Sequence, residues 1–271
     1  MATTMNEEAA RAVRPLPPSE HIRVEPSPRR VRVRFGTEFV ADSTRVLLLL
    51  ERGHTPVYYF PLEDVRTDLM MTTDRHTTCP YKGEASYWTV RAGDRMAENA
   101  VWGYPSPIAE RADIAGHVAF YWNAMDAWFE EDDEVFVHAR SPYTRVDVLS
   151  SSRHVQVVVG GEIIADTRRP RLLFETGLPT RYYIPKLDVR MDLLEPTETQ
   201  TMCPYKGKAQ YWSARIGDRV FPDLVWSYSP PIPECWRIDN LVCFFNERVD
   251  EILVDGERQA VSKTPWSLPD S

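Results

Sequence analysis

The sequence of 271 residues is poor in cysteine and glycine and contains no long apolar run. Its longest apolar segment, Val46 to Leu50, has the length of a strand and is far shorter than the roughly 18 residues of a membrane-spanning helix. The first residues also lack the apolar core of a signal peptide. We therefore expect a cytoplasmic protein with no membrane partner.

An excess of positive charge is missing as well. The chain has 32 Lys and Arg residues against 40 Asp and Glu residues, which gives a net charge of -8. General nucleic-acid binding usually requires a basic face, so we expect no nucleic-acid partner. Proline, with 22 residues, outnumbers glycine, with 12, and this favours many short segments over long helices.

The established catalytic motifs are absent from the sequence. No GxGxxG, GxxxxGK[ST], HExxH or GxSxG pattern occurs. The four cysteines, Cys79, Cys203, Cys235 and Cys243, form no CxxC pair, whereas a structural zinc site needs four converging ligands. We expect neither a metal nor a cofactor.

What the sequence does contain is a domain-sized duplication. The segment CPYKGEASYW (79–88) recurs as CPYKGKAQYW (203–212), 124 residues later, and the same offset aligns the flanking residues on both sides. We predict two copies of one domain, which pair with each other within the chain. The predicted parts are a flexible Pro-rich segment (1–28), the first domain (29–139), a connector (140–152), the second domain (153–259) and a tail (260–271).

Each copy has the period-two pattern of half-buried strands. Val31, Val33 and Phe35 alternate with arginines, and Val155, Val157 and Val159 repeat the spacing. Hairpin turns are predicted near the glycines at positions 36, 93 and 160, and short helices over 43–51 and 109–114. The predicted fold class is mainly β, with two tandem small antiparallel domains and one or two short helices in each.

Cys79 and Cys203 are the candidate catalytic residues. Each precedes a lysine, Lys82 or Lys206, by three residues, and a nearby ammonium lowers a thiol pKa. No histidine of the first copy has a histidine at its matched position in the second, so both copies lack a common base for the thiol. The favoured interpretation is a small structural cysteine beside a turn.

Two charged segments are expected to lie at the surface. In Asp64-Val65-Arg66-Thr67-Asp68, and in its copy around Arg190, the charges alternate and would share one face of a strand. A surface ion-pair ladder is the favoured interpretation, and anion binding by Arg66 and Arg190 is the alternative. The acidic stretch Phe129 to Glu134 is expected to be a solvated edge.

Aromatic residues recur in both copies. Neighbours such as Tyr87 and Trp88 must point to opposite faces of a sheet, so the aromatic side chains cannot all fill one core. Core and rim packing accounts for most of them, and the others are expected to line a concave site for a small polar or anionic ligand. The candidate ligand-binding residues are Arg66, Tyr81, Lys82, Trp88, Trp102, Tyr104, Arg190, Tyr205, Lys206, Trp212, Trp226 and Tyr228.

Three segments in fixed order carry a resemblance to a known family. The pattern YY[FI]PxxDVRxD, then CPYKGxAxYW and then VWxYxxPI occur in both copies, within 31–135 and 153–256, and resemble the family catalogued as domain of unknown function 427. The resemblance implies a β-tent-like fold similar to methionine sulfoxide reductase B and the thalidomide-binding domain of cereblon. Those relatives commonly hold zinc with two cysteine pairs, which this sequence lacks, so neither the metal nor the reductase activity carries over. The family has also been labelled nucleotidyltransferase-like, but the sequence has no phosphate loop or paired metal-binding carboxylates.

Three functions stay open. The first is a binding module with one cleft for a small polar or anionic ligand near the CPYKG segment of each copy. The second is a thiol-dependent enzyme that uses Cys79 and Cys203. The third is a structural or interaction module in which CPYKG is a turn that organises the sheet.

Overall fold

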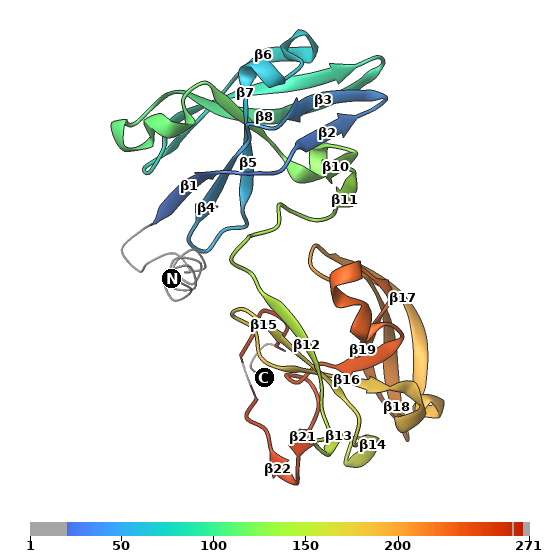
Figure 1. The fold of residues 1–271 in the computed structure, drawn as a ribbon. Coiled ribbons are helices and arrows are strands. Elements are labelled where there is room, and N and C mark those ends of the chain that lie inside the picture. The colour runs from blue at the N-terminus through green and yellow to red at the C-terminus, as the bar shows by residue number, and fades with distance from the viewer. Residues whose placement is uncertain (1–20, 262, 268–271) are drawn as a thin grey trace. The chain divides into compact units, whose positions relative to one another are not determined.

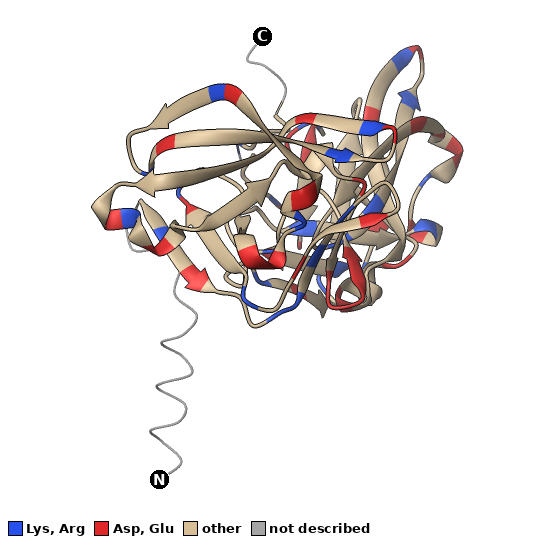
Figure 2. Cartoon of the chain, turned by 90° about the horizontal axis from the view of Figure 1, so that it is seen from above, with Lys and Arg blue, Asp and Glu red and all other residues tan. Residues whose placement is uncertain are grey.

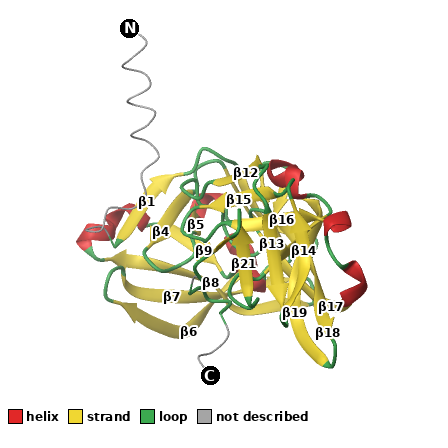
Figure 3. Cartoon of the chain, turned by 90° about the horizontal axis from the view of Figure 1, so that it is seen from below, coloured by secondary structure: helices red, strands yellow, loops and turns green. Residues whose placement is uncertain are grey.

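The computed structural model describes residues 21–261 and 263–267 of the chain, which divides between Tyr143 and Thr144 into two compact units (Figure 1). We call them unit 1 and unit 2. Most of the predicted N-terminal segment lies outside the described residues. Strands dominate both units (Figure 3), and the helices of the described residues are all short 3₁₀ helices of three to six residues. None of them is long and apolar enough to span a membrane.

Unit 1 is built from short strands joined by tight turns. Its strands are β1 (Ile22–Pro26), β2 (Val31–Phe35), β3 (Glu38–Ser43), β4 (Leu47–Glu51), β5 (Val57–Pro61), β6 (Met70–Cys79), β7 (Gly83–Ala92), β8 (Arg95–Pro107), β9 (His117–Phe120), β10 (Ala127–Glu130) and β11 (Asp133–Val135). Its helices are η1 (Leu62–Asp64), η2 (Thr67–Leu69), η3 (Ala109–Ile114) and η4 (Trp122–Ala124).

Unit 2 repeats this series. Its strands are β12 (Val146–Ser150), β13 (Val155–Val159), β14 (Glu162–Thr167), β15 (Arg171–Glu175), β16 (Arg181–Pro185), β17 (Leu194–Cys203), β18 (Gly207–Ile216), β19 (Arg219–Pro231), β20 (Leu241–Phe244), β21 (Glu251–Val254) and β22 (Glu257–Arg258). Its helices are η5 (Lys186–Asp188), η6 (Met191–Leu193) and η7 (Pro233–Ile238).

Each unit contains a seven-stranded and a four-stranded antiparallel sheet. The seven-stranded sheets have the orders β1-β4-β5-β9-β8-β7-β6 and β12-β15-β16-β20-β19-β18-β17. The four-stranded sheets have the orders β11-β10-β2-β3 and β14-β13-β21-β22. The larger sheets correspond strand for strand, so the prediction of one antiparallel β domain used twice is confirmed.

The hairpins form where the glycines allow them. Gly36 joins β2 to β3 with a φ of 63°, and Gly93 joins β7 to β8 with a φ of 58°. Residues with a Cβ rarely adopt such angles. On β2 the predicted alternation is present, because Val31, Val33 and Phe35 are buried and the arginines between them are not.

The seven-stranded sheet of unit 1 is covered on both faces. One face packs against the four-stranded sheet, with Trp88 among the side chains on that side. The other face carries a separate cluster that includes Tyr87 and the buried Ile114 of η3. The opposite orientations predicted for Tyr87 and Trp88 are therefore confirmed.

The helix predicted over 43–51 is wrong, because this segment ends β3 and then forms β4. Its apolar run does not mark a helix. Leu48 and Leu50 face one cluster and Leu49 faces the other, as in a strand that is buried on both sides. The second helix, over 109–114, is present as η3.

Two other local predictions are corrected. Asp64, Arg66 and Asp68 do not share a strand face, because η1 and η2 flank a single bridge from Val65 to Ala41. Within the acidic stretch 129–134, Glu130 is buried rather than solvated. Alternation along β10 turns Glu130 inward, where it is bound by Arg29 and Arg140 and accepts a hydrogen bond from the Tyr58 hydroxyl at 2.6 Å.

The predicted N-terminal segment and connector each contain an edge strand. β1 pairs with β4, and β12 pairs with β15. Each completes the outer edge of a seven-stranded sheet, so residues from 22–26 and 146–150 belong to the folded units.

A substitution at Gly103 can test how closely β8 packs against β9. A Cβ at this position would lie 2.9 Å from the carbonyl oxygen of His117 and 3.0 Å from Val118 Cγ1. We expect Gly103→Ala to lower the free energy of unfolding of unit 1 by about 1–3 kcal/mol through overpacking, measured by chemical denaturation. The matched control is Ser227→Ala, because the buried Ser227 hydroxyl has no hydrogen-bond partner in the described chain and its loss should not destabilise unit 2. Equal stability of Gly103→Ala and wild type would contradict this view of the packing.

Candidate functional site

A buried ion pair shows that the seven-stranded sheet is strongly curled. Lys82 lies in the turn between β6 and β7, and Glu51 lies at the end of β4. Four strand spacings separate β4 from β7, which is roughly 19 Å in a flat sheet. The Lys82 ammonium nevertheless lies 2.5 Å from the Glu51 carboxylate, and the rings of His21 and Tyr81 are in contact, tilted by 33° with centroids 4.0 Å apart. The two ends of the sheet therefore approach each other, and we call the enclosed side the concave face.

Unit 2 repeats the ion pair. Lys206 lies 2.5 Å from Glu175, and both side chains are almost fully buried. Burial is the largest influence on the pKa of Lys206 and lowers it, but the nearby Cys203 and Glu175 together outweigh burial, so the pKa lies above its ordinary value. The lysine is consequently charged at neutral pH and is held by its carboxylate.

The concave face of unit 1 is rich in aromatic side chains. Tyr59 from β5, Tyr87 from β7, and Trp102 and Tyr104 from β8 belong to one cluster. The Trp102 Nε1–H donates a hydrogen bond to the Tyr59 hydroxyl at 3.3 Å. Unit 2 repeats this bond between Trp226 and Tyr183 at 3.1 Å. Burial raises the pKa of Tyr59 above its ordinary range, so this phenol stays neutral.

An exposed aromatic pair lies at the rim of the concave face in unit 1. The rings of Trp102 and Tyr121 are 4.5 Å apart, Trp102 is half-buried, and Tyr121 is 41% exposed. Burial, followed by the neighbouring Tyr87 hydroxyl, raises the pKa of Tyr121. The Arg75 guanidinium lies over the Tyr87 ring, 4.6 Å from its centroid.

One hydroxyl on this face is not used by the fold. Tyr104 is only 6% exposed, and its hydroxyl forms no hydrogen bond within the part of the chain that the structure describes. Burial raises the pKa of Tyr104 above its ordinary range, so the hydroxyl keeps its proton. The Tyr87 hydroxyl, by contrast, is hydrogen-bonded to Thr77 Oγ1 at 2.8 Å. Tyr104 therefore keeps a protonated hydroxyl that the described fold does not bond.

The candidate catalytic cysteines lie at the concave clusters, and the lysine of each CPYKG segment is bound to a glutamate. Cys79 is partly buried and packs beside the Tyr59 cluster, and Cys203 packs similarly in unit 2. The Lys82 ammonium is taken up by Glu51. The remaining thiols are buried, and burial raises the pKa of Cys235 to about 11 and that of Cys243 to about 12.

Several predicted ligand-binding residues are not brought to the concave face. Trp88 faces the core between the sheets, and Trp212 alternates with Tyr211 on β18 in the same way. Arg66 binds Asp68 and Glu38, and Arg190 binds Asp192. For the charged segment around Arg66, the surface ion pair is therefore the better interpretation.

Three of the predicted residues converge on the concave face of each unit. In unit 1 they are Lys82, Trp102 and Tyr104, with the exposed Tyr81 against His21 at the adjoining rim. In unit 2 they are Lys206, Trp226 and Tyr228, while the contacts of Tyr205 include its carbonyl oxygen, which accepts a hydrogen bond from Cys235.

Four residues of the site were missed by the sequence analysis. Glu51 and Glu175 are identical in the two copies, and this repetition was an available signal. Tyr121 and Arg75 gave no such signal, because phenylalanine and threonine occupy positions 245 and 199.

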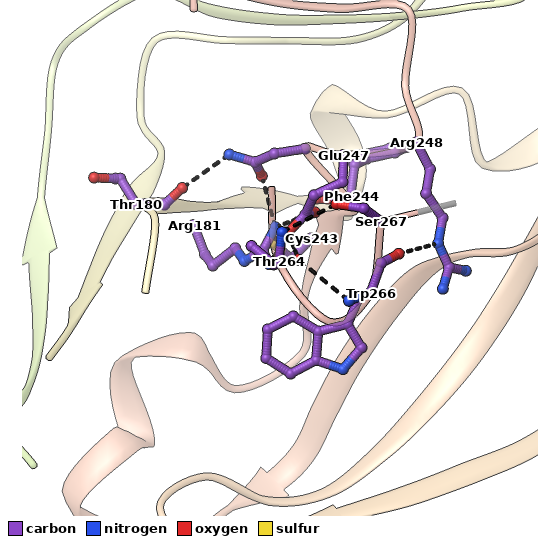
Figure 4. A network of polar contacts seen from close by, with 10 residues as sticks. Thr180, Arg181, Cys243, Phe244, Glu247, Arg248, Thr264, Trp266 and Ser267 are labelled. Atoms are coloured by element: carbon purple, nitrogen blue, oxygen red, sulfur yellow. Dashed lines mark hydrogen bonds and ion pairs between the residues drawn. The ribbon is translucent and has the colours of Figure 1, made fainter. Parts of the chain in front are cut away.

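In unit 2, Arg181 and Glu247 belong to a network of polar contacts that reaches residues 264–267 (Figure 4). The buried Arg181 guanidinium forms two hydrogen bonds with Glu247, at 2.6 and 2.7 Å, and lies between the rings of Trp226 and Trp266. Thr264 donates a further hydrogen bond to Glu247 at 2.6 Å. These contacts link β16 to residues near the C-terminus. We call those residues, Thr264–Ser267, the C-terminal cap.

Acidic and basic residues are interspersed along the ribbon (Figure 2), and many of the arginines form ion pairs with carboxylates. Within the described ranges, no three His, Cys, Asp or Glu side chains converge as metal ligands.

The comparisons with known proteins give one finding. The family model described as "Domain of unknown function (DUF427)" matches residues 23–131 and 147–255, once in each unit. No curated protein matches the chain significantly.

The ion pair of unit 1 can be tested by removing its partners singly and together. We expect Glu51→Gln and Lys82→Met each to lower the free energy of unfolding by about 3–5 kcal/mol, because each leaves a buried charge without its partner. The double variant should recover most of this loss. Chemical denaturation measures all three, with Arg66→Gln as the exposed-pair control that changes little. Additive losses in the double variant would contradict a direct interaction.

The cap should weaken in acid. Burial is the largest influence on the pKa of Glu247 and raises it, but the hydrogen bonds from Arg181 and Thr264 outweigh it, so the pKa lies below the ordinary 4.5. A lowered carboxyl pKa contributes stability above pH 4.5 that is lost as the pH falls through the lowered value.

We therefore expect Glu247→Gln to be less stable than wild type by a constant amount above about pH 5.5, and by a shrinking amount below pH 4.5. Denaturation curves from pH 3 to 8 measure this difference. A difference that does not change with pH would show that folding does not lower the pKa of Glu247.

Proposed function

Because the chain belongs to the family described as domain of unknown function DUF427, which matches each unit once, we propose that its function resides in the feature that the units share. This feature is the concave face of the curled sheet, and its proposed function, where the rim is open, is to bind a small molecule. The family match itself supplies no ligand or reaction, so the proposal is argued from the contacts on this face.

The observation that carries the proposal is the rim of the concave face in unit 1. Large aromatic side chains ordinarily bury their surface in a core or an interface. Tyr121 is 41% exposed beside the half-buried Trp102, and the protonated Tyr104 hydroxyl on the same face is not hydrogen-bonded within the described residues. Exposed rings beside a few polar groups are typical of small-molecule sites.

The polar groups of the site divide into a frame and a contact surface. Glu51 and Lys82 neutralise each other, and the Trp102 indole is fixed by Tyr59, so these bonds hold the frame. The exposed faces of Trp102 and Tyr121 and the hydroxyl of Tyr104 are left to contact a ligand. A ring or another flat group would pack against the aromatic pair and accept a hydrogen bond from Tyr104.

The thiol-dependent reaction has less support. Cys79 and Cys203 are partly buried, and the lysine of each CPYKG segment is bound to a glutamate. An activated thiol ordinarily has a base or an unengaged cation beside it. Ligand binding without covalent chemistry is therefore the function that the geometry favours.

Ligand-induced stabilisation tests the proposed function. We expect metabolites that bind the concave face to raise the melting temperature of the full chain, corresponding to about 2.7 kcal/mol at a hundredfold excess over Kd. Trp102→Leu should abolish this stabilisation. The control is Trp236→Leu, because Trp236 is 62% exposed on η7 and is not part of the concave cluster.

A broad metabolite panel with no stabilising compound would contradict the proposal. So would hits that retain full affinity in Trp102→Leu, measured by calorimetry. Either result would favour a structural or interaction module without a ligand.

A further inference from the structure

The two concave faces differ at their rims although their frames are the same. Tyr121 in unit 1 is 41% exposed, whereas its counterpart Phe245 in unit 2 is 6% exposed. Trp102 is half-buried, and its counterpart Trp226 is 7% exposed. The aromatic pair is thus accessible in unit 1 and covered in unit 2.

In unit 2, side chains of the same unit cover the aromatic pair of Trp226 and Phe245. The Arg181 guanidinium lies 5.5 Å from the Trp226 ring and 5.7 Å from the Trp266 ring of the C-terminal cap. Arg248 lies 4.2 Å from the Phe245 ring and donates a hydrogen bond to the Trp266 carbonyl oxygen at 3.0 Å. Both ring surfaces that a ligand would use are therefore occupied.

Unit 1 has none of these covering groups at the matched positions. Val57 occupies the position of Arg181, and Asn123 occupies that of Glu247. A duplicated frame therefore carries an uncovered aromatic pair in one copy only.

Unit 1 instead has a guanidinium, that of Arg75, which has no carboxylate partner among the described residues. Arg75 stacks over Tyr87 at 4.6 Å, and Tyr87 is paired across the strands with Trp102. No carboxylate of the described residues forms an ion pair with Arg75. The position corresponds to Thr199 in unit 2, whose hydroxyl is bound to Asp223.

We propose that unit 1 alone binds the ligand, and that the ligand is a planar ring bearing a carboxylate or phosphate group. This inference rests on the proposed function. The ring packs on Trp102 and Tyr121, and the anionic group is bound by Arg75, whose forked donors suit carboxylate and phosphate oxygens. Stacking on Tyr87 orients the guanidinium before the ligand arrives, which lowers the entropy cost of binding.

Fragments matched in shape and different in charge test the proposal. The probes are aryl carboxylates and aryl phosphates, each paired with its neutral carboxamide or alcohol, and calorimetry on the full chain gives the affinity and the stoichiometry. We expect the anionic members to bind at one equivalent per chain and more tightly than their neutral partners. The two anionic series distinguish a carboxylate from a phosphate ligand.

Substitutions then assign the anion contact. Arg75→Gln should weaken the anionic fragments roughly tenfold to a hundredfold, as expected for a charge-assisted hydrogen bond, and should leave neutral fragments unchanged. Arg75→Lys should retain part of the preference. The matched control is Arg34→Gln, which removes a guanidinium stacked 5.8 Å from the Phe129 ring on the four-stranded sheet.

The outcomes separate this inference from the proposed function. Fragments that depend on Trp102 but bind equally well in neutral form, or that keep their affinity in Arg75→Gln, would overturn the anionic assignment alone. Two equivalents per chain would overturn the assignment to unit 1. If no fragment depends on Trp102, both this inference and the proposed function fail.

Discussion

The curl of each seven-stranded sheet depends on one buried lysine–glutamate pair. The pair joins residues 31 positions apart in sequence, and four strand spacings apart in the sheet. Buried ion pairs often stabilise a fold no more than apolar groups of the same volume, because both charges lose their hydration. The contribution of Lys82 and Glu51 is therefore chiefly geometric. Their short contact requires the strands between them to bend, whereas an apolar pair would allow a range of separations.

The curl determines which residues the sheet needs. A sheet packed on one face only would show alternating apolar and polar residues. Here the second face is enclosed as well, and β4 accordingly presents leucines to both sides. The aromatic rings of β5, β7 and β8 fill the enclosed side, where the bond from Trp102 to Tyr59 satisfies two buried polar groups. The concave face is thus a second core whose rim stays open in unit 1.

Local patterns made the architecture predictable, and long-range contacts made the site difficult to predict. The duplication, the glycine hairpins and the opposed orientations of Tyr87 and Trp88 all follow from short-range periodicity or from self-comparison. The leucine run before Glu51 predicts a helix when the sequence is considered alone. A strand that is covered on both faces has the same uninterrupted apolar residues, so their spacing does not distinguish the two structures. The sequence around Glu130 predicts a solvated residue, because its partners Arg29 and Tyr58 lie 101 and 72 positions away. No local sequence pattern reveals partners that are so distant in the sequence.

Arg75 and Tyr121 are also difficult to predict from the sequence, because they differ from their counterparts in the second copy. Comparing the two copies for identity selects the positions that the shared frame requires, such as the lysine–glutamate and tryptophan–tyrosine pairs. Positions that differ between the copies decide which side chains contact the rim. Val57 and Arg181 occupy one position of a common frame, and the arginine closes in unit 2 a surface that the valine leaves open in unit 1. In a duplicated domain, identity between the copies therefore locates the scaffold, and divergence on a contiguous surface locates the difference in function.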